Sequence, residues 1–311
     1  MKIVALAGGV GGAKLAYGLA QILPPEDLTV IVNTGDDFEH YGLYICPDLD
    51  TVCYTLAGMA NPLTGWGRSD ETWNAFQNAA RIGGPDWFRL GDQDLGTHLE
   101  RTRRLNEGQT LTQITKDFCR AWGIRQTVLP MSDQPVRTIV ETEEGDLAFQ
   151  EYFVHRRCEP PVKGFRFEGA QKAGPAPGAC EAIRSADAVI ICPSNPWVSI
   201  DPILRVLSPL PWGEGPGVRV VAVSPILGGH AVKGPAAKMY RELGIEPSGL
   251  AVASHYHGLA NGFVLDKIDE QLKGDVMGLS MRILVTNTLM DSLDNRSQLA
   301  QDVLNFIGTD L

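Results

Sequence analysis

The sequence predicts an α/β fold whose core is a Rossmann-like, doubly wound and mostly parallel sheet, interrupted by a largely helical insertion. The first observation is a pair of short apolar runs, Ile3–Ala7 and Leu28–Val32, with the length expected of parallel strands buried on both faces. The second is the segment between them, a glycine-rich loop followed by a helical pattern that ends before Pro24-Pro25. Together they form a β-α-β unit, the start of a doubly wound sheet.

Apolar runs return late in the chain and predict four further strands, at residues 188–192, 218–223, 250–253 and 282–285. Between about 51 and 180 the pattern changes. Residues 70–80, 95–104 and 111–122 predict helices with a polar face, and 138–143 with 146–153 predict a β-hairpin. We therefore expect residues 1–50 and 181–311 to form a nucleotide-binding core and residues 51–180 to form the insertion. Segments 174–178 and 208–217 are rich in proline and glycine and are expected to be surface loops.

The composition excludes several classes of protein. The chain has 311 residues, a formal net charge of −10 and a sequence pI of about 5.1, so we expect no nucleic-acid surface, which would need a basic face. Six scattered cysteines without a C-x-x-C pair indicate reduced thiols. No apolar run approaches the ~18 residues of a membrane span. Glycines interrupt the apolar N-terminus, so it is predicted to form a strand rather than a secretory signal. We therefore expect a cytoplasmic location.

The glycine-rich loop, Gly-Gly-Val-Gly-Gly-Ala-Lys over residues 8–14, predicts a phosphate site. Glycines let the backbone approach a phosphate closely, and a helix N-terminus offers unpaired N–H groups and a positive dipole end. We therefore assign substrate binding to Gly9, Gly11, Gly12 and Lys14. The loop lacks the third glycine of the dinucleotide fingerprint and the Gly-Lys-Ser/Thr ending of a Walker A loop. The simpler alternative is a tight turn with close packing of helix against strand.

Four carboxylates follow the second predicted strand, at the sheet edge where open α/β sheets bind ligands. They are Asp36, Asp37, Asp48 and Asp50. One or two carboxylates beside substrate phosphates suit Mg²⁺, and we assign metal or ligand binding to Asp37 and Asp50. Asp48 is more simply the N-cap of a helix that begins near Leu49. An acidic residue at this position also suits the ribose of a nicotinamide nucleotide, which leaves a dehydrogenase open.

Other polar segments have less specific patterns. Residues 88–98 are dense in polar groups, and Ser194 and Asn195 follow a predicted strand at the same ligand-binding edge. His255 and His257 are expected to be structural histidines, because no third metal ligand lies near them in the sequence. The remaining cluster is expected to be a solvated helix face and comprises Arg101, Arg103 and Arg104.

The set of motifs resembles the 2-phospho-L-lactate transferase family of coenzyme F420 biosynthesis. The motifs occur in order from residue 8 to residue 196: Gly-Gly-Val-Gly-Gly-Ala-Lys, Asn-Thr-Gly-Asp-Asp, Pro-Asp-Leu-Asp-Thr, Leu-Gly-Asp-Gln-Asp, Leu-Pro-Met-Ser-Asp and Pro-Ser-Asn-Pro. Ser224-Pro225-Ile226 and Lys233-Gly234-Pro235-Ala236 continue the series, so the resemblance covers nearly the whole chain.

This resemblance implies a reaction. A guanosine-diphospho ester of lactate, enolpyruvate or glycerate would be the donor, and the ribityl hydroxyl of the deazaflavin FO (7,8-didemethyl-8-hydroxy-5-deazariboflavin) would be the acceptor. The hydroxyl would attack the phosphorus that bears the acid, and GMP would leave with help from Mg²⁺. Asp50 and Arg89 match family positions that bind FO, where Arg89 replaces a lysine. Asp92 of the same motif, with Ser194 and Asn195, completes the expected substrate-binding set, and the insertion forms the deazaflavin side of the site.

We expect Asp50 to orient or deprotonate the attacking hydroxyl and Asp37 to share the metal ion with Asp50. Two other classes of protein remain open. One is a nicotinamide-dependent oxidoreductase that uses the glycine loop and an acidic residue at the ribose. The other is a non-catalytic, sugar-nucleotide-binding regulator of the gluconeogenesis-factor type, which shares the glycine-rich start. A homodimer is the expected assembly, because two-fold dimers are the commonest closed oligomers.

Overall fold

A computed structural model describes residues 1–208 and 219–309. Its core is a seven-stranded sheet with the strand order β14-β13-β10-β9-β1-β2-β5, and every pair of neighbours is parallel. The strands are β1 (Ile3–Ala7), β2 (Leu28–Val32), β5 (Thr127–Pro130), β9 (Ala188–Ile191), β10 (Arg219–Val223), β13 (Gly262–Asp266) and β14 (Arg282–Thr286). The predicted doubly wound α/β fold is confirmed. The expected loop at 208–217 lies, except for its first residue, outside the described residues.

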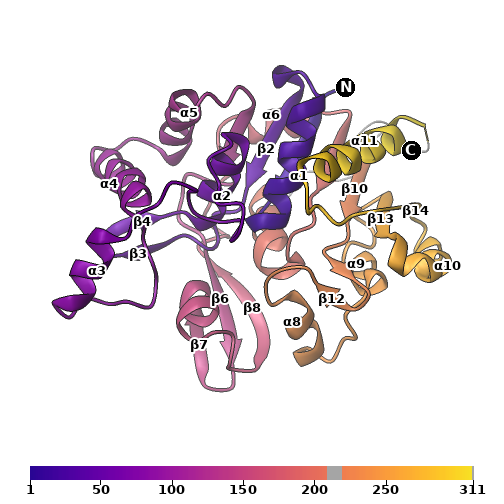
Figure 1. The fold of residues 1–311 in the computed structure, drawn as a ribbon. Coiled ribbons are helices and arrows are strands. Elements are labelled where there is room, and N and C mark those ends of the chain that lie inside the picture. The colour runs from indigo at the N-terminus through magenta and orange to yellow at the C-terminus, as the bar shows by residue number, and fades with distance from the viewer. Residues whose placement is uncertain (209–218, 310–311) are drawn as a thin grey trace.

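Alternate residues of the central strands face opposite layers of helices, which explains why their sequences are continuously apolar. Ile3, Ala5 and Ala7 pack against one layer, whereas Val4 and Leu6 pack against the other. The first layer contains α1 (Gly9–Ile22), α2 (Pro47–Leu56), α5 (Leu111–Ala121) and α11 (Leu293–Thr309). The second contains α6 (Ala179–Arg184), α7 (Asp201–Leu207), α8 (Ala236–Glu242), α9 (Gly249–His255) and α10 (Lys273–Met277). Figure 1 shows α1 and α11 side by side near the two chain ends.

The segment 51–180 is built around helices and a small antiparallel sheet. It holds most of α2, all of α3 (Asn74–Arg81), α4 (Asp92–Asn106) and α5, and a three-stranded sheet in the order β7-β6-β8. These strands are β6 (Arg137–Thr142), β7 (Gly145–Ala148) and β8 (Val162–Glu168). In Figure 1, α3 and α4 extend to one side of the main sheet and β6, β7 and β8 lie below it. The segment also supplies β5, which pairs with β2 at the edge of the main sheet.

Short elements complete the chain. They are η1 (Pro25–Asp27), β3 (Phe38–His40), β4 (Leu43–Ile45), η2 (Glu151–His155), η3 (Pro196–Ile200), β11 (Ile226–Leu227), β12 (His230–Ala231) and η4 (Lys267–Leu272). The six cysteines are free thiols. Within residues 1–208 and 219–309, no helix has both the length and the apolar character needed to cross a membrane.

Two predicted strand segments are corrected by the structure. Residues 250–253 belong to α9, because the side chain of Ser248 caps the helix by accepting a hydrogen bond from the Ala251 N–H at 3.1 Å. A short apolar run fits a buried helix as well as a strand, and the core strand here is β13 instead. The expected hairpin is present, but its second strand ends at Ala148, and residues 151–153 lie in η2.

Candidate functional site

The candidate site is a cavity of about 710 Å³ at the carboxyl edge of the sheet. Chain direction across the sheet reverses between β1 and β9, because β2 extends the sheet on one side and β10 on the other. Ligands of open α/β sheets bind at such a switch point. The loops that follow β1, β2 and β9 all reach the cavity, together with segments that follow β10 and β14.

The glycine loop packs directly against the loop after β9. A side chain at Gly11 would place its Cβ 2.1 Å from the Pro193 carbonyl oxygen, and one at Gly12 would lie 2.7 Å from Ser194 Oγ. Ser194 Oγ also accepts a hydrogen bond from the Gly8 N–H at 3.2 Å and donates one to the Gly8 carbonyl at 2.7 Å. Close packing therefore requires these two glycines, as the simpler alternative supposed.

The same loop also presents the start of α1 to the cavity. Gly9, Val10 and Gly11 line the cavity, and Gly8, the residue before the helix, has no side-chain cap among the described residues. Unpaired N–H groups at a helix start attract anions. Gly12 lies just behind this lining, against Ser194. The tight turn and the anion site are thus two properties of one loop.

Lys14 adds positive charge beside this helix start. Its Nζ lines the cavity and donates a hydrogen bond to the Met290 carbonyl at 2.7 Å. Burial, followed by repulsion from Arg296 and Lys233, lowers the pKa of Lys14. Lys233 lines the cavity too and donates to the Thr64 carbonyl at 2.6 Å. A bound anion would relieve the repulsion between these cations.

The carboxylates after β2 divide between the cavity and the protein interior. Asp36 and Asp48 line the cavity, whereas Asp37 is 1% exposed and points toward Arg137 and Cys46. Asp48 is not the N-cap of α2: that helix starts at Pro47 after Cys46, so Asp48 lies in its first turn. Asp48 Oδ2 instead accepts a hydrogen bond from Asn33 Nδ2 at 2.9 Å.

Burial raises the pKa values of Asp36 and Asp48, two of the carboxylates that line the cavity. The pKa of Asp36 is raised well above its usual value by burial and by the negative charge of Asp48, and burial raises the pKa of Asp48 to about 6. Asp36 Oδ1 has no hydrogen-bond partner among the described residues. The pair lies beside the start of α1, because a Cβ at Gly8 would be 2.7 Å from Asp48 Oδ2. A divalent cation fits this arrangement, because it would pair the free oxygen and offset the repulsion.

The site at Asp36 and Asp48 fits a metal ion that takes its remaining ligands from substrate and water. No cluster of three or more His, Cys, Asp and Glu side chains arranged for a metal ion occurs in the described part of the chain. Mg²⁺ binds in this way, through one or two carboxylates together with phosphate oxygens.

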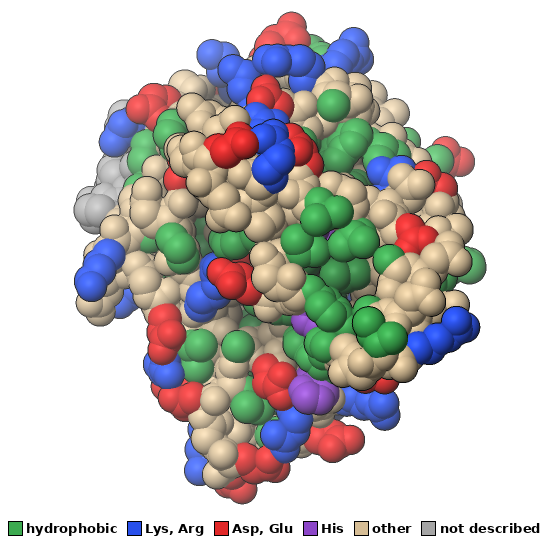
Figure 2. Space-filling view, turned by 90° about the vertical axis from the view of Figure 1, so that its left-hand side faces the viewer, with side chains coloured by type: hydrophobic (Ala, Val, Ile, Leu, Met, Phe, Trp, Pro, Cys, Tyr) green, Lys and Arg blue, Asp and Glu red, His purple; other side chains and the backbone are tan. Residues whose placement is uncertain are grey.

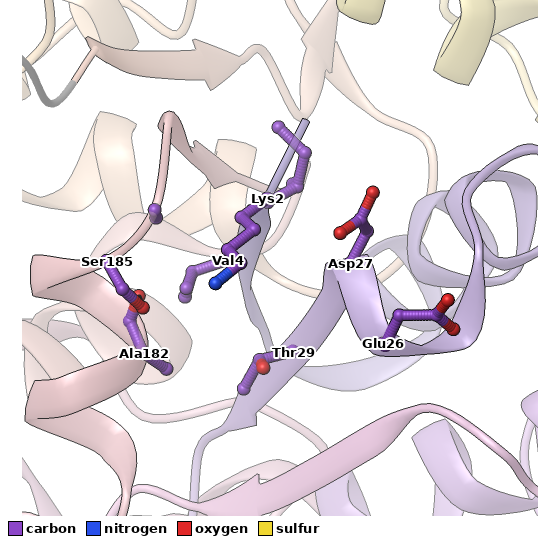
Figure 3. Close-up of a pocket in the computed structure, with 9 residues that line it drawn as sticks. Lys2, Val4, Glu26, Asp27, Thr29, Ala182 and Ser185 are labelled. Carbon is purple, nitrogen blue, oxygen red and sulfur yellow. Dashed lines mark hydrogen bonds between the residues drawn. The ribbon is translucent and has the colours of Figure 1, made fainter.

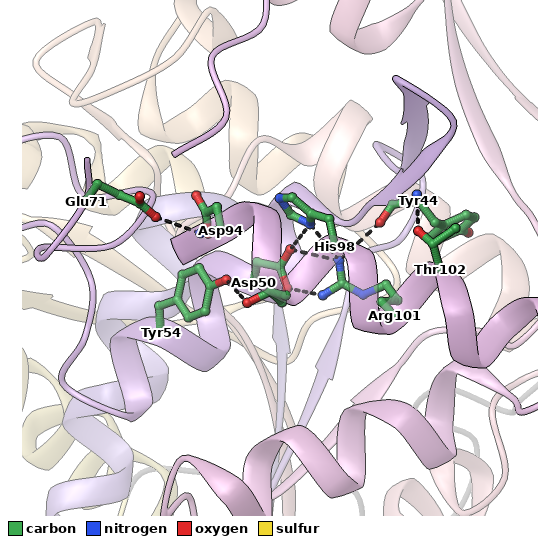
Figure 4. A network of polar contacts seen from close by, with 9 residues as sticks. Tyr44, Asp50, Tyr54, Glu71, Asp94, His98, Arg101 and Thr102 are labelled. Carbon is green, nitrogen blue, oxygen red and sulfur yellow. Dashed lines mark hydrogen bonds and ion pairs between the residues drawn. The ribbon is translucent and has the colours of Figure 1, made fainter. Parts of the chain in front are cut away.

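Asp50 is held by Arg101, which corrects the prediction of a solvated arginine. Arg101 is 1% exposed, and its guanidinium pairs with both Asp50 oxygens, through Nη2 to Oδ1 and through Nη1 to Oδ2 at 3.0 Å. Figure 4 shows this pair with His98 beside it. Burial raises the pKa of Asp50, and the charge of Arg101 opposes that shift. The neighbouring Arg103 is exposed and pairs with Glu100, as a solvated face predicts.

His98 is a neutral hydrogen-bond donor in this network. Its Nδ1 lies 3.2 Å from Arg101 Nη1, and a guanidinium can only donate, so Nδ1 accepts and Nε2 carries the proton. Burial and the charge of Arg101 lower the pKa of His98 well below its usual value. His98 lines the cavity together with Asp50 and Tyr54. The Tyr54 hydroxyl donates a hydrogen bond to Thr97 Oγ1 at 2.9 Å.

Six aromatic side chains that no sequence pattern indicated also line the cavity, and we call them the aromatic wall. It comprises Tyr54, Trp66, Trp87, Phe88, Phe149 and Phe153. Figure 2 shows hydrophobic side chains gathered on the face of the molecule that carries these segments, with histidine beside them. Arg89 lines the cavity as predicted, and its guanidinium lies over the Trp73 ring, 4.2 Å from the centroid. Such a wall suits a planar, conjugated ligand.

The other predicted substrate residues have mixed positions. Asn195 lines the cavity, and its side-chain oxygen accepts a hydrogen bond from the Trp197 N–H at 3.1 Å. Asp92 lies outside the cavity lining, where its carboxylate accepts hydrogen bonds from the Thr72 hydroxyl at 2.6 Å and the Ala75 N–H at 3.0 Å. The roles of these residues in substrate binding stay predictions.

A smaller cavity of about 100 Å³ lies at the opposite end of the strands (Figure 3). Lys2, Asp27, Thr29 and Ser185 are among its lining residues, at the amino ends of β1 and β2. Ligands of parallel sheets bind at the carboxyl ends, and this cavity has the volume of a few water molecules. The larger cavity is therefore the candidate functional site.

Comparisons with known proteins identify a matching family and a similar fold. The profile of the family described as 2-phospho-L-lactate transferase CofD matches residues 3–286. A phosphoenolpyruvate transferase of Streptomyces avermitilis is 42% identical and covers 98% of this chain and 97% of its own. A 2-phospho-L-lactate transferase of Methanothermobacter thermautotrophicus is 38% identical, with 98% of each chain covered. Among solved structures, a UPF0052-family protein of Bacillus halodurans has a TM-score of 0.65 at 18% identity, over 97% of this chain and 99% of that one. That structural likeness concerns the fold.

Proposed function

Because the chain belongs to the 2-phospho-L-lactate transferase family of coenzyme F420 biosynthesis, we propose that it transfers a phospho-acid group from a guanosine-diphospho donor to FO. The terminal ribityl hydroxyl of FO attacks the phosphorus that bears the acid, and GMP leaves. The observation that supports this most strongly is a single cavity that combines an anion-binding helix start, two lysines, paired carboxylates and an aromatic wall.

The start of α1 and the two lysines would hold the diphosphate of the donor. Gly9 and Gly11 line the cavity at the start of α1, where the Gly9 N–H also interacts with the Asp48 carboxylate, and Lys14 and Lys233 supply positive charge there. Phosphoryl transfer depends mainly on positioning and charge neutralisation, and these groups provide both. The carboxylates Asp36 and Asp48 would otherwise repel the diphosphate at this position.

We propose that Asp36 and Asp48 hold Mg²⁺, in place of the predicted pair Asp37 and Asp50. Both Asp37 oxygens lack a hydrogen-bond partner among the described residues, but Asp37 does not line the cavity. Both Asp50 oxygens pair with Arg101, whereas Asp36 lines the cavity and has an oxygen without such a partner. When bound, Mg²⁺ would neutralise negative charge on the diphosphate oxygens. Asp50 would then line the cavity as a carboxylate fixed by Arg101, whereas Asp37 would lie in the interior next to the metal-binding pair.

The aromatic wall would receive the tricyclic ring of FO. Trp87 and Phe153 supply flat apolar surface, and Arg89 supplies charge next to it. The whole cavity, about 710 Å³, is within the usual range of about 300–1,000 Å³ for small-molecule sites. Among the three candidate acids, the names of the relatives at 42–43% identity support enolpyruvate as the first to test. We also propose a cytoplasmic location and a homodimer, the commonest closed oligomer.

A single-turnover assay tests the proposal. Purified protein is mixed with FO, Mg²⁺ and, in turn, the guanosine-diphospho esters of enolpyruvate, lactate and glycerate, and GMP release and product mass are measured. We expect product with the enolpyruvate donor, and a loss of turnover when Asp36 is replaced by Asn. Failure to bind FO in a fluorescence titration would contradict the proposal and favour a nucleotide-binding regulator.

A further inference from the structure

The motif at residues 90–94, Leu-Gly-Asp-Gln-Asp, contains two aspartates with different environments. Asp92 caps the neighbouring helix α3, because its carboxylate accepts from the N–H groups of Asn74 at 3.1 Å and Ala75 at 3.0 Å. In return, Glu71 caps α4, because it accepts from the N–H groups of Gln93 at 2.9 Å and Asp94 at 2.7 Å. Asp92, the first residue of α4, therefore caps α3, and Glu71, which lies just before α3, caps α4.

This exchange explains the glycine of the motif as well. A Cβ at Gly91 would lie 2.0 Å from the carboxyl carbon of Glu71, so only glycine leaves room for the capping carboxylate. Asp94 occupies the first turn of α4, where an acidic side chain often serves the helix end. Here Glu71 already serves that end by accepting from the Asp94 N–H (Figure 4), so the carboxylate of Asp94 does not act as the cap.

The carboxylate of Asp94 is turned to the cavity. Asp94 lines the cavity, and its Oδ1 is buried with no hydrogen-bond partner among the residues in the described ranges. The other cavity carboxylate on this side, Asp50, has both oxygens paired with Arg101. Burial, followed by the negative charge of Asp50, raises the pKa of Asp94 to about 7. The charge of Glu71 adds to this rise, whereas the Tyr54 hydroxyl and the charge of Arg68 oppose it. A carboxylate with this pKa suits proton transfer near neutral pH.

His98 lies four residues after Asp94 and therefore on the same face of α4. It lines the cavity as a neutral ring whose Nε2–H can donate, while Asp94 Oδ1 can accept. A hydroxyl both donates and accepts, so an acceptor on one side and a donor on the other orient it. The pair is arranged to bind a hydroxyl group.

From this arrangement we infer that Asp94 is the catalytic base that accepts the proton of the attacking ribityl hydroxyl, with His98 as a positioning residue. The inference rests on the proposed function. The hydroxyl oxygen forms a bond to the phosphorus that bears the acid, the bond from that phosphorus to the GMP oxygen breaks, and its electron pair leaves with GMP. The hydroxyl proton moves to Asp94 and is then lost to water. Protein kinases place an aspartate in the same role.

The test is the pH dependence of the single-turnover rate in the wild type and in Asp94→Asn. Both are measured at saturating Mg²⁺, which keeps Asp48 ionised, because the pKa of Asp48 is raised to about 6 and its protonation would otherwise add a second acidic limb. We expect the wild-type rate to fall below about pH 7, as Asp94 becomes protonated. In Asp94→Asn we expect a rate lower by about 10²–10⁴, the usual contribution of a positioned base, without that acidic limb. Asp94→Glu, which keeps the carboxyl group, should recover part of the rate together with the limb.

A matched control is Glu100→Gln on the same helix. The Glu100 side chain is exposed and pairs with Arg103 at the surface. Its substitution removes the same charge as Asp94→Asn, so the rate and its pH profile should match the wild type. Folding is checked by the thermal midpoint and by FO binding, both of which Asp94→Asn should keep.

The outcomes separate the two proposals. An active wild type with Asp94→Asn within about threefold of its rate, or with the same acidic limb, would overturn the role of Asp94 alone. A wild type that forms no product with any of the three donors would instead overturn the proposed function.

Discussion

Arg101 and Asp50 form a buried ion pair whose members depend on each other. Their side chains are 2% and 9% exposed, so each charge is largely removed from water and is compensated mainly by its partner. Loss of one member leaves an uncompensated charge, which costs more than the pair itself contributes. Arg101 is therefore a structural residue of the site, although a polar helix such as α4 would be expected to expose its arginines to solvent.

A double-mutant cycle tests this dependence. We expect Arg101→Met to lower the free energy of unfolding by about 3–5 kcal/mol, and the double variant Arg101→Met/Asp50→Asn to recover a large part of that loss. Urea denaturation measures both. The single variant Asp50→Asn completes the cycle. If the loss of unfolding free energy in the double variant equalled the sum of the losses in the two single variants, the two side chains would be independent and the proposed dependence would be wrong.

Asp37 should make the stability of the protein depend on pH. Burial raises its pKa from 3.8 to about 7, so between these values the folded state keeps a proton that the unfolded state has lost. The contribution of Asp37 to the free energy of unfolding is therefore complete below about pH 4 and is lost as the pH rises to 7. In Asp37→Asn that loss is absent.

We expect Asp37→Asn to match the wild type near pH 4 and to become more stable than it by a few kcal/mol above pH 7, since each unit of pKa shift corresponds to about 1.4 kcal/mol. Chemical denaturation with a chelator present, so that metal binding does not contribute, measures the difference. Parallel stability curves for the two proteins would contradict the raised pKa.

At the scale of elements, helices in this protein approach each other at glycines. Gly18 in α1 is the clearest case, because a Cβ there would lie 2.1 Å from the Arg296 carbonyl oxygen in α11. Gly96 in α4 is its opposite, because its Cβ would meet no atom within 4 Å among the described residues. Both glycines lie inside helices, where alanine is intrinsically favoured by about 0.5–1 kcal/mol.

The two substitutions to alanine should therefore have opposite signs. Gly18→Ala should destabilise the protein by about 1–3 kcal/mol, because the overpacked α1–α11 contact must open. Gly96→Ala should stabilise it by about 0.5–1 kcal/mol through helix propensity alone. Thermal or urea unfolding of the two variants measures the change in stability. A stabilising Gly18→Ala would show that α1 and α11 are less closely packed than described.

At the scale of the whole molecule, the candidate site depends on segments that are far apart in the chain. Residues after β1, β2, β9, β10 and β14 meet at one cavity, because the sheet brings their carboxyl ends to one edge. A nucleotide and metal bound there would stabilise the folded chain as a unit, since the unfolded chain has no such site.

Metal removal should reveal this coupling. We expect guanosine diphosphate with Mg²⁺, at one hundred times its Kd, to stabilise the protein by about 2.7 kcal/mol, seen as a rise in the thermal midpoint. A chelator, or Asp48→Asn, should remove most of that rise. An equal rise without Mg²⁺ would contradict the role of the Asp36 and Asp48 pair, and cytidine diphosphate serves as the control for the base.

Several features could be predicted from the sequence because neighbouring residues decide them. The buried strands β1 and β2 follow from continuous apolar runs of five residues, and the start of α1 follows from its glycines. Arg89, Asp50 and the glycine loop were expected at the site, and all three line the cavity. The family was identified from ordered motifs, which the comparisons confirm.

Other features were decided only by the tertiary structure. Residues 250–253 form a helix in the second layer, because a four-residue apolar run fits either state until its packing is set. Asp36 rather than Asp37 faces the cavity, although the two are adjacent and identical. Arg101 is buried because Asp50, 51 residues away, meets it across two helices. Local pattern determines which segments form strands and helices, but the burial of a charge depends on a partner that only folding brings near.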